Sequence, residues 1–153
     1  MIMLRVTLWH EPEYFGFYIK DPGAEISMGP SEATEVEQHR FAARQGIVTV
    51  GVKSEYTTIP ITVEFDQLGA EPPERTDWDR IVECSLAIHE RAIVFEGSTG
   101  TEFGRLEVPP GNYRTRIHYG GQNIIQGDGE TGDFYLIQIW PSSDVSSIVI
   151  KSE

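Results

Sequence analysis

Apolar and polar residues alternate along most of this chain. Residues 3–9 show the pattern clearly, with Leu4, Val6 and Leu8 on one face of the expected strand. A period of two is typical of β-strands. The same pattern predicts about ten short strands, at residues 3–9, 14–19, 47–53, 59–65, 80–88, 92–96, 104–108, 113–119, 134–140 and 147–151. Many short strands separated by turns favour an all-β fold, an antiparallel β-sandwich.

Turn-forming residues separate these strands. Residues 89–91 form a link short enough for an antiparallel hairpin, and residues 109–112 (Pro-Pro-Gly-Asn) indicate a tight turn. Pro60 lies inside a predicted strand, although proline cannot donate a backbone hydrogen bond to a sheet. We therefore expect this strand at a sheet edge, or Pro60 at the start of the strand or at a bulge.

One segment departs from the strand pattern. Residues 31–43 are predicted to form the one short helix, with Ser31 as a possible N-cap and acidic residues in the first turn. Gly46 is expected to end it. No repeat, low-complexity stretch or shift in composition divides the sequence, so we predict a single β-sandwich domain over residues 1–153.

The chain is strongly acidic, because 24 Asp and Glu residues against 12 Lys and Arg residues give a net charge of −12. Phosphate backbones and anionic lipids are bound by clustered basic side chains, so we expect neither nucleic acid nor a membrane as a partner. A large charged partner would be a basic protein. The alternative is that the acidity serves solubility alone.

The single cysteine, Cys84, excludes an internal disulfide, which fits a reducing compartment. The first ten residues lack the features of a secretory signal, and no stretch approaches the ~18 apolar residues that a membrane span needs. We expect a soluble cytoplasmic protein. These features leave its oligomeric state open.

Residues with catalytic or metal-binding chemistry are scattered. Cys84 alternates with Val82 and Leu86, so we expect a small buried residue and not a nucleophile. No nucleophile elbow, P-loop or dinucleotide motif is present, and the sequence predicts no catalytic residue and no cofactor. No two histidines lie at metal-ligand spacing, and we interpret all four as polar residues of strand ends and turns. They are His10, His39, His89 and His118.

Three carboxylates, Asp128, Glu130 and Asp133, lie in or beside a glycine-rich stretch at residues 127–132. Carboxylates on a flexible loop can collect around Ca²⁺, which tolerates irregular oxygen ligands. The stretch lacks the glutamate that ends an EF-hand loop. We favour a solvated loop without metal and keep calcium binding as the open alternative.

The segment from residue 64 to residue 79, called the acidic segment below, is the most informative stretch. It contains six acidic residues and one basic residue, Arg75, and Pro72 and Pro73 restrict its backbone. A pre-ordered acidic connection suits a basic partner, because less entropy is lost on binding. Trp78 is either an aromatic anchor for that partner or a plug over the end of the sandwich. The predicted partner-binding residues are Glu64, Asp66, Glu71, Glu74, Asp77, Trp78 and Asp79.

Several of these features follow one another in a recognisable order over residues 4–140. They are two early strands, an acidic helical stretch ending in Phe41-Ala42-Ala43, strands at 46–50 and 59–65, a charged loop leading to residues 79–86, and the turn at residues 106–113. This order is similar to the competence protein J family, small acidic β-rich inhibitors of the DNA-entry nuclease of competent bacteria. The resemblance implies a β-sandwich that binds and silences a nuclease, with acidic groups in place of DNA phosphates. It assigns no individual residue, and residues 127–132 and the proline pair are additions to the family order.

Three functions are open at this point. The leading hypothesis is a non-enzymatic, acidic protein-binding domain, an inhibitor or immunity-type protein that occludes a basic nuclease. The second is a small-ligand or carbohydrate-binding sandwich whose stacking surfaces would be Trp9, Tyr14, Tyr18, Tyr119 or Trp140. The third is an enzyme with a site assembled from His10, His118 and loop carboxylates.

Overall fold

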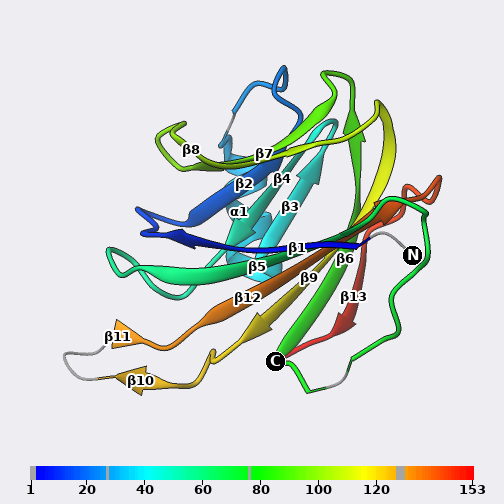
Figure 1. The fold of residues 1–153 in the computed structure, drawn as a ribbon. Helices are drawn as coiled ribbons and strands as arrows, with labels where there is room; N and C mark the ends of the chain where they lie inside the picture. The colour runs from blue at the N-terminus through cyan, green and yellow to red at the C-terminus, as the bar shows by residue number, and fades with distance from the viewer. Residues whose placement is uncertain (1–2, 27, 76, 127–129) are drawn as a thin grey trace.

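In the computed structural model, which describes residues 3–26, 28–75, 77–126 and 130–153, two β-sheets face each other as the layers of a sandwich (Figure 1). The larger sheet has the strand order β1-β5-β12-β9-β6-β13. Its strands are β1 (Met3–His10), β5 (Ile59–Asp66), β12 (Phe134–Pro141), β9 (Gly111–Gly120), β6 (Arg80–Ile88) and β13 (Ile148–Lys151).

The smaller sheet has the order β3-β4-β2-β7-β8. Its strands are β3 (Phe41–Arg44), β4 (Ile47–Gly51), β2 (Gly16–Lys20), β7 (Ala92–Gly97) and β8 (Glu102–Glu107). Helix α1 (Pro30–His39) and a ribbon of β10 (Ile125–Gln126) and β11 (Glu130–Thr131) complete the described fold. Neighbouring strands are antiparallel except for β5 and β12, which are parallel. The predicted all-β sandwich with one short helix is confirmed.

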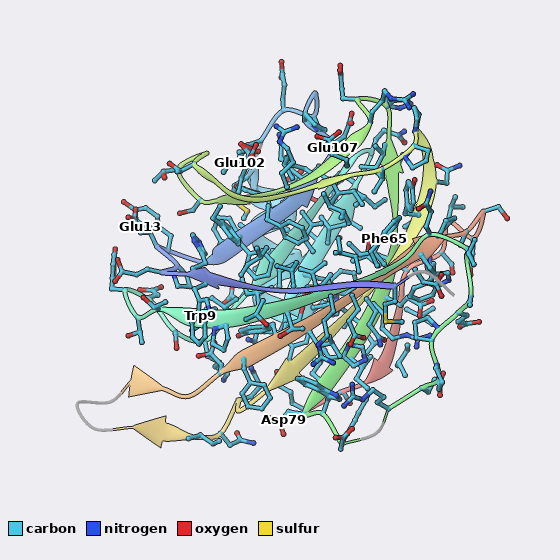
Figure 2. All side chains as sticks on the ribbon, viewed as in Figure 1. Trp9, Glu13, Phe65, Asp79, Glu102 and Glu107 are labelled. Carbon is cyan, nitrogen blue, oxygen red and sulfur yellow. The ribbon has the colours of Figure 1, made fainter. Side chains whose placement is uncertain are left out.

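The core lies between the two sheets, where strands of both layers direct alternate side chains inward (Figure 2). Burying these apolar side chains is the main favourable term in folding, at ~25 cal/mol per Å². The core side chains include Ile61, Val63 and Phe65 of β5, Ile117 and Tyr119 of β9, Tyr135, Ile137 and Ile139 of β12, and Phe17, Ile19, Val48, Val50, Ile93 and Phe95 of the smaller sheet.

Strand β1 forms one edge of the larger sheet and pairs with β5 alone. Leu4 and Val6 are 46% and 41% exposed, and only Leu8 of the predicted apolar face packs against the core. The period of two therefore identifies the strand correctly but does not show how far its face is buried, because burial depends on the opposing sheet.

Pro60 is the second residue of β5, which is an interior strand and not an edge. The parallel pairing of β5 with β12 begins at Ile61, so Pro60 has a neighbouring strand on one side only, where it lies opposite Trp9. Of the three explanations that we expected, the position of Pro60 at the start of the strand is correct. Proline lacks a backbone N–H, and at this position β12 provides no residue to which an N–H would donate.

The helix is shorter than predicted and has different ends. Gly29 is its N-cap, so Ser31 lies inside the helix, and Arg40 ends it in a left-handed conformation with φ of 70°. The chain then forms β3, which the sequence pattern does not predict. Pairing with β4 buries Phe41, and this tertiary contact outweighs the helix propensity of the alanines that follow. Gly46, with φ of 74°, serves the turn between β3 and β4 instead of ending the helix.

The predicted hairpin at residues 89–91 is wrong, because β6 and β7 belong to different sheets. The three-residue link crosses from one layer to the other. Asp21 fixes the crossing, since its Oδ1 accepts hydrogen bonds from the backbone N–H groups of His89 and Glu90 at 3.1 and 2.9 Å. A short link alone cannot distinguish a hairpin from such a crossing. Within the described chain, no helix is long and apolar enough to cross a membrane.

Cys84 is buried in the core, as its alternation with apolar residues predicts. Burial raises the pKa of its thiol to about 12. Since the thiolate is the reactive form, the folded protein at pH 8 should react with a disulfide reagent at least ~10³-fold more slowly than the same protein in concentrated urea. Absorbance of the released thiol chromophore measures both rates. Similar rates in buffer and in urea would show that Cys84 is accessible.

Candidate partner-binding site

A cluster of charged side chains is buried on the outer face of the larger sheet. The inner face of β9 carries core residues such as Ile117 and Tyr119, so alternation turns Arg114 and Arg116 to the opposite face. These arginines are each 1% exposed, and Glu83 of the neighbouring strand β6 is 5% exposed. Charged side chains are this deeply buried only when they are paired.

Glu83 bridges the two arginines. Its Oε2 accepts a hydrogen bond from Arg114 Nε at 2.6 Å, and its Oε1 accepts one from Arg116 Nε at 2.9 Å. Further donors of Arg114 are satisfied by the backbone carbonyl of Ser146, and the guanidinium of Arg116 lies 5.0 Å from the centre of the Trp140 ring. The cluster thus connects β6 and β9 to the chain at Ser146, which lies over them.

Arg116 also holds the acidic segment on the sheet. Its Nη1 donates to the carbonyl of Pro72 at 2.9 Å, and its Nη2 lies 3.1 Å from Glu71 Oε1. Proline has already fixed one backbone angle at this point, so the two bonds order a stretch with little freedom left. The acidic segment is therefore fixed at its centre by a buried cation.

Trp78 packs on the same outer face. Its ring lies 5.3 Å from the ring of His118 and 5.5 Å from that of Phe134, and the guanidinium of Arg75 lies 5.7 Å from it. The side chain is half-buried. Trp78 therefore covers the outer face of the larger sheet and not the end of the sandwich, and its role as a partner anchor stays a prediction.

The structure divides the predicted acids into two groups. Glu71, Glu74 and Asp77 are exposed. Glu64 is buried, accepting a hydrogen bond from Gln138 Nε2 at 2.9 Å, and Asp66 is buried, accepting one from the N–H of Leu68 at 2.9 Å. Asp79 is half-buried, and its Oδ2 accepts from the N–H of Gln122 at 2.9 Å. Only the first three acids are exposed enough to meet a protein surface, although Glu71 also pairs with Arg116 and Asp77 lies near Arg75. The docking prediction continues with those three.

Sequence reasoning missed the arginines and Glu83. The signal available was the Arg-Thr-Arg pattern at residues 114–116, in which charged residues occupy alternate positions of a strong strand. Alternation places both arginines on one face. It does not reveal that a distant segment covers that face, or that Glu83 lies opposite Arg116.

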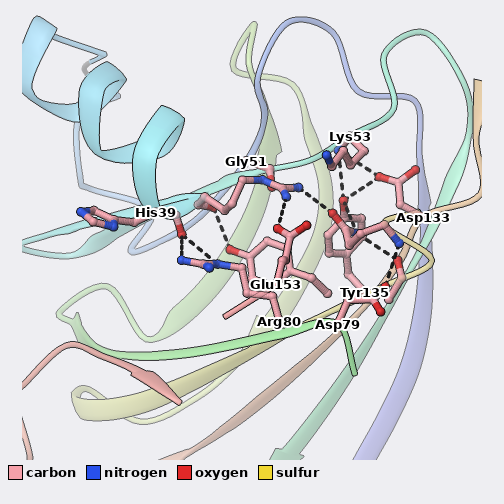
Figure 3. Close-up of polar contacts among 12 residues, drawn as sticks. His39, Gly51, Lys53, Asp79, Arg80, Asp133, Tyr135 and Glu153 are labelled. Atoms are coloured by element: carbon pink, nitrogen blue, oxygen red, sulfur yellow. Dashed lines mark hydrogen bonds and ion pairs between the residues drawn. The ribbon is translucent and has the colours of Figure 1, made fainter. Parts of the chain in front are cut away.

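A second polar network lies at one end of the sandwich (Figure 3). The carboxylate of Asp133 accepts hydrogen bonds from the backbone N–H groups of Lys53 and Ser54, at 3.1 and 3.2 Å, and from the hydroxyl of Tyr135 at 2.6 Å. Burial and the charge of Asp133 raise the pKa of Tyr135 well above its usual value. These contacts fasten β12 to the chain that follows β4, so we interpret the network as structural.

This network also bears on the calcium alternative. Asp128 lies outside the described residues, and the side chain of Glu130 is not described. Asp133 uses its carboxylate oxygens for protein donors, as described above. Among the described residues, no group of three or more His, Cys, Asp and Glu side chains could hold a metal ion.

The other two functional hypotheses lose part of their basis. Three of the five proposed stacking surfaces are buried, with Tyr18, Tyr119 and Trp140 only 1%, 0% and 3% exposed. Each of these residues lies in a strand that pairs with its neighbours, so contacts within the protein cover its ring. For the enzyme hypothesis, His10 stacks on Phe103 at 4.0 Å while His118 packs against Trp78, so the two histidines have separate surroundings.

Comparisons with known proteins support the fold. No protein-family model matches the sequence, and no curated protein is similar in sequence. The structure is similar to ComJ from Bacillus subtilis, an inhibitor of the DNA-degrading activity of NucA, with a TM-score of 0.70 and 12% identity over 93% of this chain and 100% of ComJ. It is also similar to the crocagin biosynthetic gene J protein, with a TM-score of 0.58 and 11% identity over 93% and 99% of the two chains. The resemblance to competence protein J is thus confirmed for the fold.

Removing the shared anion of the cluster should destabilise the protein. Glu83→Gln removes the buried carboxylate that the two guanidinium groups share and leaves them only the exposed carboxylates of Glu71 and Asp144. We expect the free energy of unfolding to fall by roughly 3–5 kcal/mol. Urea denaturation measures the change. The control is Glu102→Gln, which removes the exposed pair with Arg105 and should change stability little. Equal effects of the two substitutions would contradict a buried cluster.

His118 should make stability depend on pH. Burial, with the nearby charges of Arg116 and Arg75, lowers the pKa of His118 to about 4, whereas the unfolded chain titrates near ~6.5. Between these values the unfolded state binds more protons, so stability is lost as the pH falls from 6.5 towards 4. His118→Gln should remove on the order of 3 kcal/mol of this pH dependence, and exposed His89→Gln should not. Parallel curves for wild type and His118→Gln would refute the assignment.

Proposed function

We propose that the protein binds a basic nuclease and inhibits it, as an inhibitor or immunity-type protein with no enzymatic activity of its own. The observation that carries the proposal is the similarity of nearly the whole fold to ComJ, which inhibits a DNA-degrading activity. The net charge of −12 favours a basic protein as the partner over nucleic acid or a membrane.

The proposed mechanism is occlusion of the surface that holds DNA. Glu71, Glu74 and Asp77 are exposed on the acidic segment and would pair with Arg and Lys side chains that otherwise bind phosphates. Arg116 supports this arrangement because it fixes the segment at Glu71 and Pro72 before any partner arrives. A segment that is already ordered loses less conformational entropy on binding.

Inhibition can be measured directly. The immobilised protein is used to capture salt-sensitive partners from an extract of its natural host, and the captured fraction is assayed for degradation of DNA. We expect a nuclease whose activity is suppressed by one equivalent of added protein. A captured nuclease that stays fully active at a large excess of the protein would contradict the proposal.

The acidic segment should set the association rate. The combined variant Glu71→Gln, Glu74→Gln and Asp77→Asn removes three exposed negative charges. Because charges on a binding surface steer diffusional encounter, we expect association with the captured nuclease to slow by roughly tenfold at low salt and the difference to shrink at high salt. Surface plasmon resonance gives the rates.

The control separates local charge from total charge. The combined variant Glu11→Gln, Glu37→Gln and Glu107→Gln also removes three exposed charges, at positions outside the acidic segment. It should slow association much less. If both variants slow association equally, overall charge and not the acidic segment steers the partner.

A further inference from the structure

A pocket of about 330 Å³ lies between the acidic segment and the outer face of the larger sheet. Glu64, Asp66 and Gln138 line it from β5 and β12, and Glu71 and Pro72 line it from the part of the acidic segment that follows β5. Its volume is near the lower limit for small-ligand sites, ~300 Å³. The pocket is therefore large enough for one long side chain but not for a folded element.

Carboxylates outnumber basic side chains in the lining of the pocket, although Glu71 is also paired with the buried Arg116. Three of its side chains are carboxylates, and Arg75 is the basic residue that lines it. The guanidinium of Arg75 lies over the Trp78 ring, with its Nε 3.9 Å from Asp77. Arg5 pairs with Glu64 at 3.2 Å, but the Arg5 side chain is 68% exposed, so a competing cation can displace it with little loss of packing.

Gln138 adds an independent observation. The residue is 5% exposed, and its Nε2 donates to Glu64 Oε1 at 2.9 Å. That bond fixes the orientation of the amide, because a reversed amide would place two acceptors against each other. Its Oε1 is then a buried acceptor with no hydrogen-bond partner. Unpaired buried polar atoms are uncommon in folded proteins, and each calls for an explanation such as a water molecule or a donor from a bound group.

From this geometry we infer that the pocket receives an arginine side chain of the partner protein. A guanidinium group presents several N–H donors in one plane, which suits two or three carboxylates together with the amide oxygen of Gln138. The apolar stem of the same side chain would lie along Met3 and the proline pair at the rim. The inference rests on the proposed function for the identity of the partner, but binding to the pocket needs no partner to be tested.

The probe is N-acetylarginine N-methylamide, titrated at low salt into the ¹⁵N-labelled full chain. We expect saturable shifts of the Gln138 side-chain NH₂ resonance and of the backbone amides of residues 64–66 and 71. The matching citrulline derivative has a similar shape without the charge and should bind at least roughly tenfold more weakly. Equal shifts with both compounds, or no saturation with the arginine compound, would overturn the inference.

Two variants locate the binding. Glu71→Gln removes a carboxylate of the pocket, whereas Glu74→Gln removes a neighbouring exposed carboxylate that is not part of its lining. The first should weaken probe binding roughly tenfold, and the second should leave it nearly unchanged. A third variant, Gln138→Met, removes the unpaired acceptor and should also weaken probe binding, and its fold can be checked in the same spectra. Equal weakening by Glu71→Gln and Glu74→Gln would show that the probe binds to the acidic surface and not in the pocket.

The result of the probe experiment can be told apart from the result of the test of the proposed function. If the probe fails to bind but the three-acid variant still slows association with the nuclease, the pocket is wrong and the inhibitor proposal stands. If the probe binds in the pocket but no nuclease is inhibited, the arginine site stands and the proposed function is wrong.

Discussion

The ion cluster of Glu83 with Arg114 and Arg116 is the interaction on which the candidate site depends. The outer face of a sandwich is usually solvated, whereas here both arginines are 1% exposed under covering chain. Arg116 shares its donors between Glu83 and the acidic segment, and Arg114 shares its donors between Glu83 and the carbonyl of Ser146. The acidic segment and the chain at Ser146 keep water from the cluster, and the hydrogen bonds of the cluster hold both segments in place.

Local pattern explains much of the fold. Each strand predicted from alternation has a counterpart, and residues 80–88 coincide with β6. The predictions fail where a contact between residues that are distant in the sequence determines the local structure. Phe41–Arg44 is a short stretch containing two alanines that suits a helix equally well, and only pairing with β4 makes it a strand. The link at residues 89–91 is equally short in a hairpin and in a crossing between sheets.

The candidate site was predictable as a segment but not as individual residues. Composition and prolines identify residues 64–79, because a run of like charge is visible without any structure. Which acids are exposed depends on how the segment lies over β5 and β12, and this burial separates Glu64 from Glu71. The partner of Arg116 depends likewise on the register between β6 and β9, which sets Glu83 opposite it. Long-range register is the information that a single sequence does not provide.

The proposed docking mechanism requires that the acidic segment be ordered before it meets a partner. The most direct measurement is the ¹⁵N order parameter of the backbone amides at residues 70, 71, 74 and 75 in the free protein at neutral pH. We predict values near ~0.85, like those of the adjoining strands. Values below ~0.6 would show a flexible loop and would contradict the claim that the buried arginine holds the segment in place.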